Sequence, residues 1–228
     1  AATGNEKYLE GFGPPAPGYM HAPLNNTNVV RDMVDDETAG ILVEPIQGEG
    51  GIRATTVQFL KDLPAICDEF GLLLFYDEIH TGFGRTGKMW GYDWSGVKPD
   101  VAAIAKGMGG GFPIGALLLR ERLNAALPPG THGATFGGNA LASRAARTVL
   151  AVLEEEGLVQ GARDKGEHLA RGLARLVEAH PRVLVGHRGR GLLQAAVLAP
   201  GLDGRSALVK LREHGVLQPV LVRPREGG

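Results

Sequence analysis

Two charged residues in this chain each close an apolar run of strand-like composition. Asp77 ends the run LLLFYD and is followed by EIHTG, while Lys106 ends DVAAIAK and is followed by GMGGG. A carboxylate and an amine at strand ends, next to glycine-rich turns, are the groups that a pyridoxal phosphate (PLP) site requires. The lysine would bind the cofactor aldehyde as a Schiff base, and the carboxylate would keep the pyridine nitrogen protonated.

Each of these residues, taken alone, has an ordinary structural explanation. An aspartate after a strand is commonly a turn or cap residue, and a lysine is commonly exposed to solvent. In open α/β sheets, ligands bind beyond the carboxyl ends of the strands, so both side chains would face one crevice if their strands are neighbours. The pair alone leaves a cofactor site and two structural residues equally open.

The elements that would position these residues alternate along the chain. Apolar runs predict strands over 40–45, 72–77, 100–105 and 114–119, two more around a glycine-rich turn within 183–198, and one near 216–222. Helical spacing predicts helices over 56–70, 139–155, 157–179 and 204–214. Thr55 or Thr56 would cap the first helix, and Gly71 would end it. This alternation predicts an α/β fold with a mostly parallel sheet.

Composition narrows the class of protein. The 228 residues include 24 basic and 25 acidic side chains, so no charge excess points to nucleic acid. No apolar stretch approaches the ~20 residues that cross a bilayer, and the first residues lack a signal-peptide pattern. The single cysteine, Cys67, excludes an internal disulfide. We expect a cytoplasmic protein that binds neither nucleic acid nor a membrane.

Four longer stretches carry a family resemblance. They are EPIQGEGGI (44–52), DEIHTGFGRTGK (77–88), KPDVAAIAKGMGGGFPIGA (98–116) and THGATFGGNALA (131–142). In this order they resemble the class III aminotransferases, PLP enzymes of the aspartate aminotransferase fold (fold type I), with the acetylornithine aminotransferases as the most similar subgroup. The resemblance implies the C-terminal part of a PLP-binding large domain over 1–150 and an incomplete, smaller α+β domain over 151–228.

The resemblance also implies roles around the cofactor. Lys106 would hold PLP and move a proton between substrate and cofactor, while Asp77 would pair with the pyridinium nitrogen. Ile79 would pack on one face of the ring. His80 would lie beside the phenolic oxygen of the cofactor. Thr135 would donate to the phosphate of the neighbouring subunit's cofactor, which implies a homodimer.

Two glutamates are implied on the substrate side. Glu49 matches a residue that pairs with a substrate-binding arginine and swings aside for a dicarboxylate. Glu44 matches a second active-site glutamate beneath the cofactor. His80 departs from the family pattern, which usually has glutamine. Histidine also donates a hydrogen bond and titrates near neutrality, so the change is either a functional replacement or without consequence.

The reaction implied is the transfer of the terminal amino group of N-acetylornithine to 2-oxoglutarate, in arginine biosynthesis. Aminotransferases of ornithine, 4-aminobutyrate, succinylornithine and succinyl-diaminopimelate share the core motifs and stay as alternatives. An alternative of another class is a catalytically silent fragment or paralogue that keeps the fold and the dimer surface.

Other motifs in the chain lack the context that their chemistry needs. Gly82-Phe-Gly84-Arg-Thr-Gly87 matches the dinucleotide pattern GxGxxG, but no apolar helix follows, which disfavours a nicotinamide oxidoreductase. The histidines show no metal-ligand spacing, so we expect no metal site. Ser143 lies in a helical pattern without the GxSxG setting of a hydrolase.

The resemblance implies further residues that the chain does not contain. A Gly-Thr/Ser-Glu-Ala phosphate-binding turn would lie upstream of residue 1. The arginine partner of Glu49 would lie downstream, because Arg223 and Arg225 lack the Arg-Phe/Leu-x-Pro-Pro context. We therefore expect a chain truncated at both ends, with partly uncovered apolar faces on 72–77 and 100–105. Such a chain, made alone, would bind PLP weakly and turn over poorly.

Overall fold

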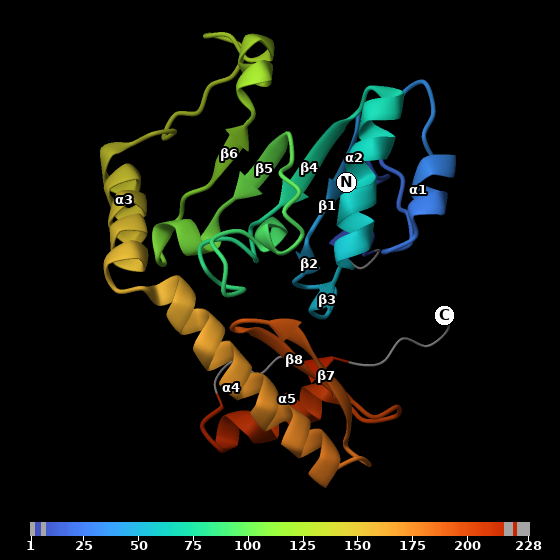
Figure 1. The fold of residues 1–228 in the computed structure, drawn as a ribbon, viewed down its shortest axis with the longest axis vertical. Coiled ribbons are helices and arrows are strands. Elements are labelled where there is room, and N and C mark those ends of the chain that lie inside the picture. Colours follow the sequence, from blue (N-terminus) through green and yellow to red (C-terminus); the bar gives the residue numbers. More distant parts are fainter. Residues whose placement is uncertain (1–2, 6–7, 217–220, 223–228) are drawn as a thin grey trace.

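The computed structural model describes residues 3–5, 8–216 and 221–222, which form two parts joined along one side (Figure 1). The upper part holds a sheet of β1 (Gly40–Val43), β4 (Leu73–Asp77), β5 (Val101–Ile104) and β6 (Ala116–Leu119). The lower part holds a sheet of β7 (Leu184–Arg190), β8 (Leu193–Leu198) and β9 (Leu221–Val222). Helices α3 (Ala140–Glu155) and α4 (Leu158–Ala179) lead from one part to the other, with α3 at the left of the view and α4 running diagonally across the lower part.

The upper sheet has the order β1-β4-β5-β6. Strands β1, β4 and β5 run parallel, and β6 pairs antiparallel with β5 at one edge. The sheet is therefore mostly parallel, as predicted, and it contains the strands expected at 40–45, 72–77, 100–105 and 114–119. Because β4 and β5 are parallel neighbours, the residues that follow them leave the sheet at the same edge.

Helix α2 (Val57–Phe70) covers one face of this sheet, and Figure 1 shows it lying along β1 and β4. It begins at Thr56, whose hydroxyl accepts a hydrogen bond from the N–H of Phe59 at 3.0 Å. It ends at Gly71, which has the left-handed φ of 69° that glycine adopts without strain. Of the two predicted caps Thr56 is the correct one, since the hydroxyl of Thr55 donates to the carbonyl of Pro45.

The main apolar core lies between α2 and the sheet. Alternation along the strand turns Leu72, Leu74 and Tyr76 to the same face, where they are buried. The α2 side chains that meet them are also buried and comprise Phe59, Leu60, Leu63 and Cys67. This burial orders β4 and thereby sets the position of Asp77 at its end.

The most exposed apolar side chains of the upper sheet lie on its outer strands, β1 and β6. The side chains of β4 and β5 are buried or half-buried. In contrast, Leu42 on β1 is 55% exposed and Leu117 on β6 is 59% exposed. The expectation holds in part for 72–77, because Leu73 and Phe75, on the face of β4 turned away from α2, are only half-buried. It does not hold for 100–105, where most side chains of β5 are buried.

Shorter elements complete the description. They are α1 (Thr27–Asp32), β2 (Ile46–Gln47), β3 (Arg53–Ala54), α5 (Gly204–Glu213) and three 3-10 turns over Gly91–Trp94, Lys106–Gly109 and Glu121–Ala126. The helices predicted at 139–155, 157–179 and 204–214 correspond to α3, α4 and α5. The predicted strand near 216–222 lies mostly outside the described residues, apart from β9. Among the described residues, no helix has the length and apolarity to cross a membrane.

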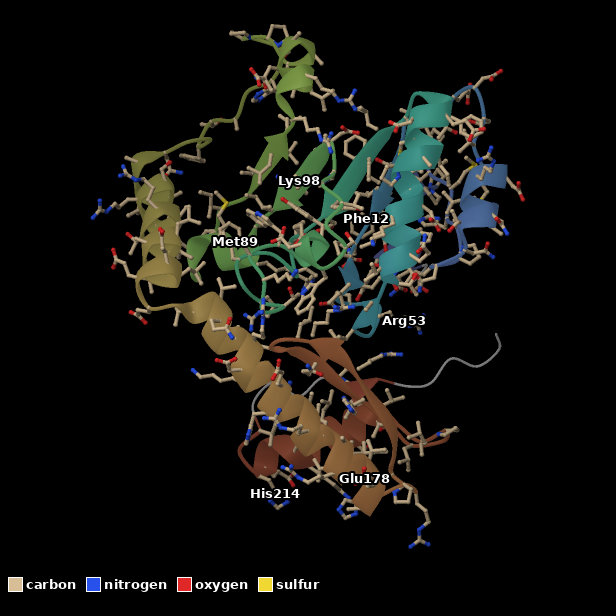
Figure 2. All side chains as sticks on the ribbon, in the orientation of Figure 1. Phe12, Arg53, Met89, Lys98, Glu178 and His214 are labelled. Atoms are coloured by element: carbon tan, nitrogen blue, oxygen red, sulfur yellow. The ribbon has the colours of Figure 1, made fainter. Side chains whose placement is uncertain are left out.

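The two parts contact each other beside the loop that follows β4. Arg188 on β7 donates from Nε to the carbonyl of Gly51 at 2.7 Å, and Arg163 on α4 donates to the carbonyl of Gly87. Arg163 and Arg190 also lie over the ring of Trp94. Arg53 on β3 lies at the junction with the lower sheet (Figure 2). The sequence predicts a boundary between two domains at residues 150 and 151. This position falls inside α3, and the domain boundary stays a prediction.

Asp100, directly before β5, joins β4 to the 3-10 turn after β6, and its ionisation gives a test of the fold. Its carboxylate accepts from the N–H of Leu74 at 3.0 Å and from Arg122 at 2.7 Å. Burial alone would raise the pKa of Asp100, but these hydrogen bonds and the charges of Arg122 and Arg120 lower it overall. The stabilisation is thus present above the pKa of an unfolded aspartate and is lost as the pH falls through the lower folded value.

We expect Asp100→Asn to lower the free energy of unfolding by about 1.5–3 kcal/mol at pH 7, the range for hydrogen bonds to a charged group. The difference from the wild type should shrink by pH 3, because an unfolded aspartate takes up a proton below about pH 3.9. Urea unfolding at both pH values measures this. Asp36→Asn is the control, because Asp36 is exposed. An equal loss at both pH values would contradict the role of the charge.

Candidate functional site

Asp77 is the last residue of β4 and stands opposite Ala103 of β5. Its side chain is half-buried, and one carboxylate oxygen accepts from the N–H of Ile79 at 2.9 Å. This bond turns the chain sharply after the strand and orients the carboxylate at the sheet edge. A carboxylate has further acceptor positions, so Asp77 is able to receive a hydrogen bond from a ligand.

Lys106 begins the 3-10 turn that follows β5. Its φ of 43° lies in the left-handed region, which residues with a side chain rarely adopt. Such strain persists where surrounding structure holds the residue, and it is typical of functional sites. The amine contacts Nε2 of His80 and lies 3.3 Å from Nδ1 of the same ring. The structure thus joins the predicted lysine to the loop after β4.

His80 is enclosed on its other side by the turn between β2 and β3. A methyl group added at Gly48 would lie 2.6–2.8 Å from three atoms of the His80 ring, so only glycine permits this approach. The N–H of Gly48 donates to a carboxylate oxygen of Glu44 at 3.0 Å. Glu44, Gly48, His80 and Lys106 therefore form a continuous chain of contacts across the site.

The pKa of Glu44 depends on the charged residues around it. Burial raises the pKa of Glu44, and repulsion from Asp77 adds to this effect. The hydrogen bond from Gly48 and the positive potential of His80 and Lys106 act in the opposite direction. The balance is a raised pKa. These effects place Asp77, His80 and Lys106 within electrostatic reach of Glu44.

Three of the predicted acidic residues, Glu44, Glu49 and Asp77, line a single depression of about 1030 Å³. Its walls also include residues of α1, β1 and the segment before α1, such as Met20 and Leu24. This volume is at the upper end of the range for small-molecule and cofactor sites. Glu49 is exposed, so it lies free to face a ligand from outside.

Thr135 is placed apart from these residues. It is exposed, on the segment between β6 and α3 that runs along the outside of the upper part (Figure 1). None of the hydrogen bonds found among the described residues joins it to Asp77, His80 or Lys106. Its expected role toward a neighbouring subunit stays a prediction.

Glu78 was not among the site residues predicted from the sequence. It is fully buried, and its carboxylate accepts from the hydroxyl of Thr81 and from the N–H groups of Gly91 and Tyr92, the last two at 2.7 and 2.9 Å. Burial raises its pKa, against the effect of these three bonds. Positions 74, 76 and 78 share a face, and this alternation is the signal that could have revealed a buried Glu78.

The loop that Glu78 holds is the one that carries Ile79 and His80. The carboxylate ties the beginning of this loop, at Thr81, to its far end at Gly91 and Tyr92. Both ends of the loop are therefore fixed relative to β4, so that His80 keeps its place beside Lys106.

Gly48 gives a second test in this region. We expect Gly48→Ala to displace the His80 ring and to lower the free energy of unfolding by about 1–3 kcal/mol, the usual cost of overpacking. Urea unfolding measures the loss. Gly133→Ala is the matched control, since a methyl there would meet nothing within 4 Å. Equal stability of the two variants would show that His80 does not pack against Gly48.

A family model for class III aminotransferases matches residues 1–223. The chain belongs to the class III aminotransferases. The curated acetylornithine aminotransferase of Brucella melitensis is 45% identical to this chain over 217 residues. The match covers 95% of this chain and 53% of the length of that relative. The acetylornithine aminotransferase of Gloeobacter violaceus is 48% identical over 95% of this chain and 54% of its own length. The chain spans about half the length of these curated relatives.

Solved aminotransferase structures agree with the fold. The ornithine aminotransferase of Toxoplasma gondii, described with partial occupancy of PLP at its active site, has a TM-score of 0.87 at 33% identity. It is matched over 96% of this chain and 51% of its own chain. The acetylornithine aminotransferase of Elizabethkingia anophelis has a TM-score of 0.79 at 31% identity, over 93% of this chain and 53% of its own. The predicted aspartate aminotransferase-like fold is thereby confirmed.

Proposed function

We propose that this chain contributes the cofactor-binding core of a PLP-dependent aminotransferase. The observation that carries the proposal is the placement of Asp77 at, and Lys106 just beyond, the carboxyl ends of two parallel, neighbouring strands. The family membership supports the same reading. The finer proposal is that the enzyme moves the terminal amino group of N-acetylornithine to 2-oxoglutarate, a step of arginine biosynthesis.

The residues present fit the ring end of PLP. Asp77 supplies a carboxylate for the pyridinium nitrogen, and Lys106 supplies an amine for the aldehyde. His80 would lie beside the phenolic oxygen, and Ile79 would pack on the ring. When bound, PLP supplies an electron sink for the carbon that loses its proton. Thr135 of a neighbouring subunit would hold the phosphate, so the functional unit would be a cytoplasmic homodimer.

Four side chains of this chain have the remaining roles in binding and proton transfer. Asp77 holds the proton on the ring nitrogen through its charge. The amine of Lys106 would serve as the base that moves a proton from the substrate carbon. Glu49 would pair with an arginine outside this chain and move aside for a dicarboxylate. Glu44 would bound the site beneath the ring, because it already lies within reach of Asp77 and Lys106.

Ornithine is the second candidate donor, since ornithine aminotransferases are among the structures of high similarity. A comparison of N-acetylornithine with ornithine, at equal concentration and with 2-oxoglutarate as acceptor, separates the two. We expect faster release of glutamate with N-acetylornithine. Faster turnover of ornithine would reverse the assignment.

The cofactor proposal is tested by adding PLP to the purified chain, reducing with borohydride and mapping the modified peptide. We expect the cofactor on Lys106, with weak binding by the chain alone. A chain that shows no covalent cofactor at any PLP concentration would favour the alternative of a silent fragment or paralogue, which keeps only the fold and the dimer surface.

A further inference from the structure

The turn between β2 and β3, residues 48–52, has an unusual backbone. Ile52 has a φ of 53°, in the left-handed region, where a β-branched residue is an outlier. The N–H groups of Gly51 and Ile52 both donate to the carbonyl of Gly48, at 3.1 and 3.3 Å, and close the turn around Glu49. Strain of this kind persists only where surrounding structure holds the residue, so contacts outside the turn have to hold Ile52.

The lower part contacts the turn through the side chain of Ile52. Ile52 is 3% exposed and packs with Ile46 and with Ala195, a buried residue of β8. Leu193 and Val197, which also belong to β8, pack against the same cluster. Burial of an apolar side chain is favourable, so the contact with β8 offsets the strain at Ile52.

Arg188 on β7 holds the neighbouring residue of the turn. Its Nε donates to the carbonyl of Gly51 at 2.7 Å. Burial lowers the pKa of Arg188, and the charge of Arg53 adds to this effect. Among the described residues no carboxylate forms an ion pair with Arg188, and its Nη2 is buried without a hydrogen-bond partner. The guanidinium therefore loses hydration, and the hydrogen bond that it gains in return is the bond to Gly51.

We propose that Arg188 is a positioning residue for Glu49, because the lower part, through Arg188 and β8, sets the conformation of the turn that presents Glu49 to the site. This role rests on the proposed function, in which Glu49 lies on the substrate side. Arg188 acts through the carbonyl of Gly51 and is not itself a catalytic residue. The same turn also reaches the cofactor side, because Gly48 lies against the ring of His80.

Two substitutions of matched length separate the hydrogen bond from the rest of the side chain. In Arg188→Gln, the amide nitrogen is bonded to Cδ as Nε is in arginine, so a donor remains near the carbonyl of Gly51. In Arg188→Met, a methyl carbon takes that place and donates nothing. Both variants lack the guanidinium charge, so a difference between them comes from the donor. Arg182→Met, at an exposed arginine before β7, is the matched control.

Hydrogen exchange of the ¹⁵N-labelled chain, followed by NMR, measures the result without the cofactor. The N–H groups of Gly51 and Ile52 should exchange about tenfold faster in Arg188→Met than in the wild type, the change expected when one hydrogen bond from a charged group is lost. The amide resonance of Glu49 should move in the same variant. Arg188→Gln should restore the exchange to within about threefold of the wild type, because a neutral donor remains, and should return the Glu49 resonance.

Helix α2 and the variant Arg182→Met show whether the effect is local. Exchange of the N–H groups of α2 should stay unchanged in all variants, since α2 packs on the upper sheet and not on the turn. Arg182→Met should alter neither the turn nor the Glu49 resonance. Acceleration that is equal in α2 and in the turn would indicate general destabilisation and would overturn the proposal.

Equal exchange in Arg188→Met and the wild type would also overturn the proposal, and so would equal effects of methionine and glutamine. Should Arg188→Met fail to fold, exchange of the wild type at rising urea concentration replaces it. The turn should then lose its protection together with β7 and β8, and protection that outlasts theirs would contradict the role of Arg188. A chain that attaches no PLP to Lys106 but shows the expected exchange would refute the proposed function alone.

Discussion

Replacing Lys106 by alanine should abolish covalent attachment of PLP to this chain and remove the visible absorbance that the cofactor gains on attachment. The amine of Lys106 is placed on the left-handed turn after β5 and directed to His80 at the same sheet edge as Asp77. Loss of a positioned proton-transfer group typically costs about 10²–10⁴-fold in rate, and loss of the covalent attachment adds to this. Any transaminase activity should therefore fall by at least that factor.

Two further variants make this prediction specific. Lys106→Arg keeps a positive charge at the position but cannot attach the aldehyde, so it should behave as the alanine variant does. Lys98→Ala is the matched control, because Lys98 is exposed and precedes the amino end of the same strand, β5 (Figure 2). It should leave attachment unchanged. Cofactor fixed by borohydride at an unchanged level in Lys106→Ala would exclude Lys106 as the cofactor lysine.

Replacing Glu78 by alanine should destabilise the upper part by about 3–5 kcal/mol. The substitution removes a buried carboxylate and leaves the hydroxyl of Thr81 and the N–H groups of Gly91 and Tyr92 without their acceptor. Each unsatisfied buried donor costs about 1–3 kcal/mol, and the cavity adds to this. Because the loop also carries His80, a looser loop should weaken the contact with Lys106.

Glu78→Gln is expected to cost less than alanine, since it fills the cavity and keeps one acceptor oxygen. Burial raises the pKa of Glu78, so the folded state binds a proton more tightly than the unfolded state does. Wild-type stability from this group is therefore greatest below the unfolded pKa and declines as the pH rises through the folded value. The deficit of Glu78→Gln should accordingly be larger at pH 5 than at pH 8.

Urea unfolding of the three proteins tests these statements, with Glu178→Ala as the control. Glu178 is an exposed residue of α4 in the lower part (Figure 2), where loss of a carboxylate should change stability little. If Glu78→Ala were as stable as Glu178→Ala, the three hydrogen bonds at Glu78 would not hold the loop.

Much of the fold follows from local pattern. Helix α2 begins and ends where its capping residues predict, because Thr56 satisfies the N–H of Phe59 and Gly71 adopts the left-handed conformation. The strands containing Leu74 and Val101 were recognisable from their apolar runs, since central strands of a mostly parallel sheet contain few polar residues. Such features depend on neighbours in sequence, so they are present in the sequence itself.

The order of the strands in the upper sheet was not predictable from the sequence. Apolar runs say that a strand is buried but not which strand lies at an edge. Leu42 and Leu117 belong to edge strands, whereas the runs that were expected to be exposed form the centre of the sheet. Strand order is a property of pairing between distant segments, and no local pattern encodes it.

By itself, the sequence determined the chemistry that this protein is equipped for. Asp77 and Lys106, each at the end of an apolar run, and the four motifs around them indicated a PLP aminotransferase, because residue type and spacing decide which groups a chain can offer. Only the tertiary structure decided which groups meet. The contact of Lys106 with His80, the closeness of Gly48 to that ring and the burial of Glu78 all join segments far apart in the chain. Their distances depend on how β1, β4 and β5 pack side by side.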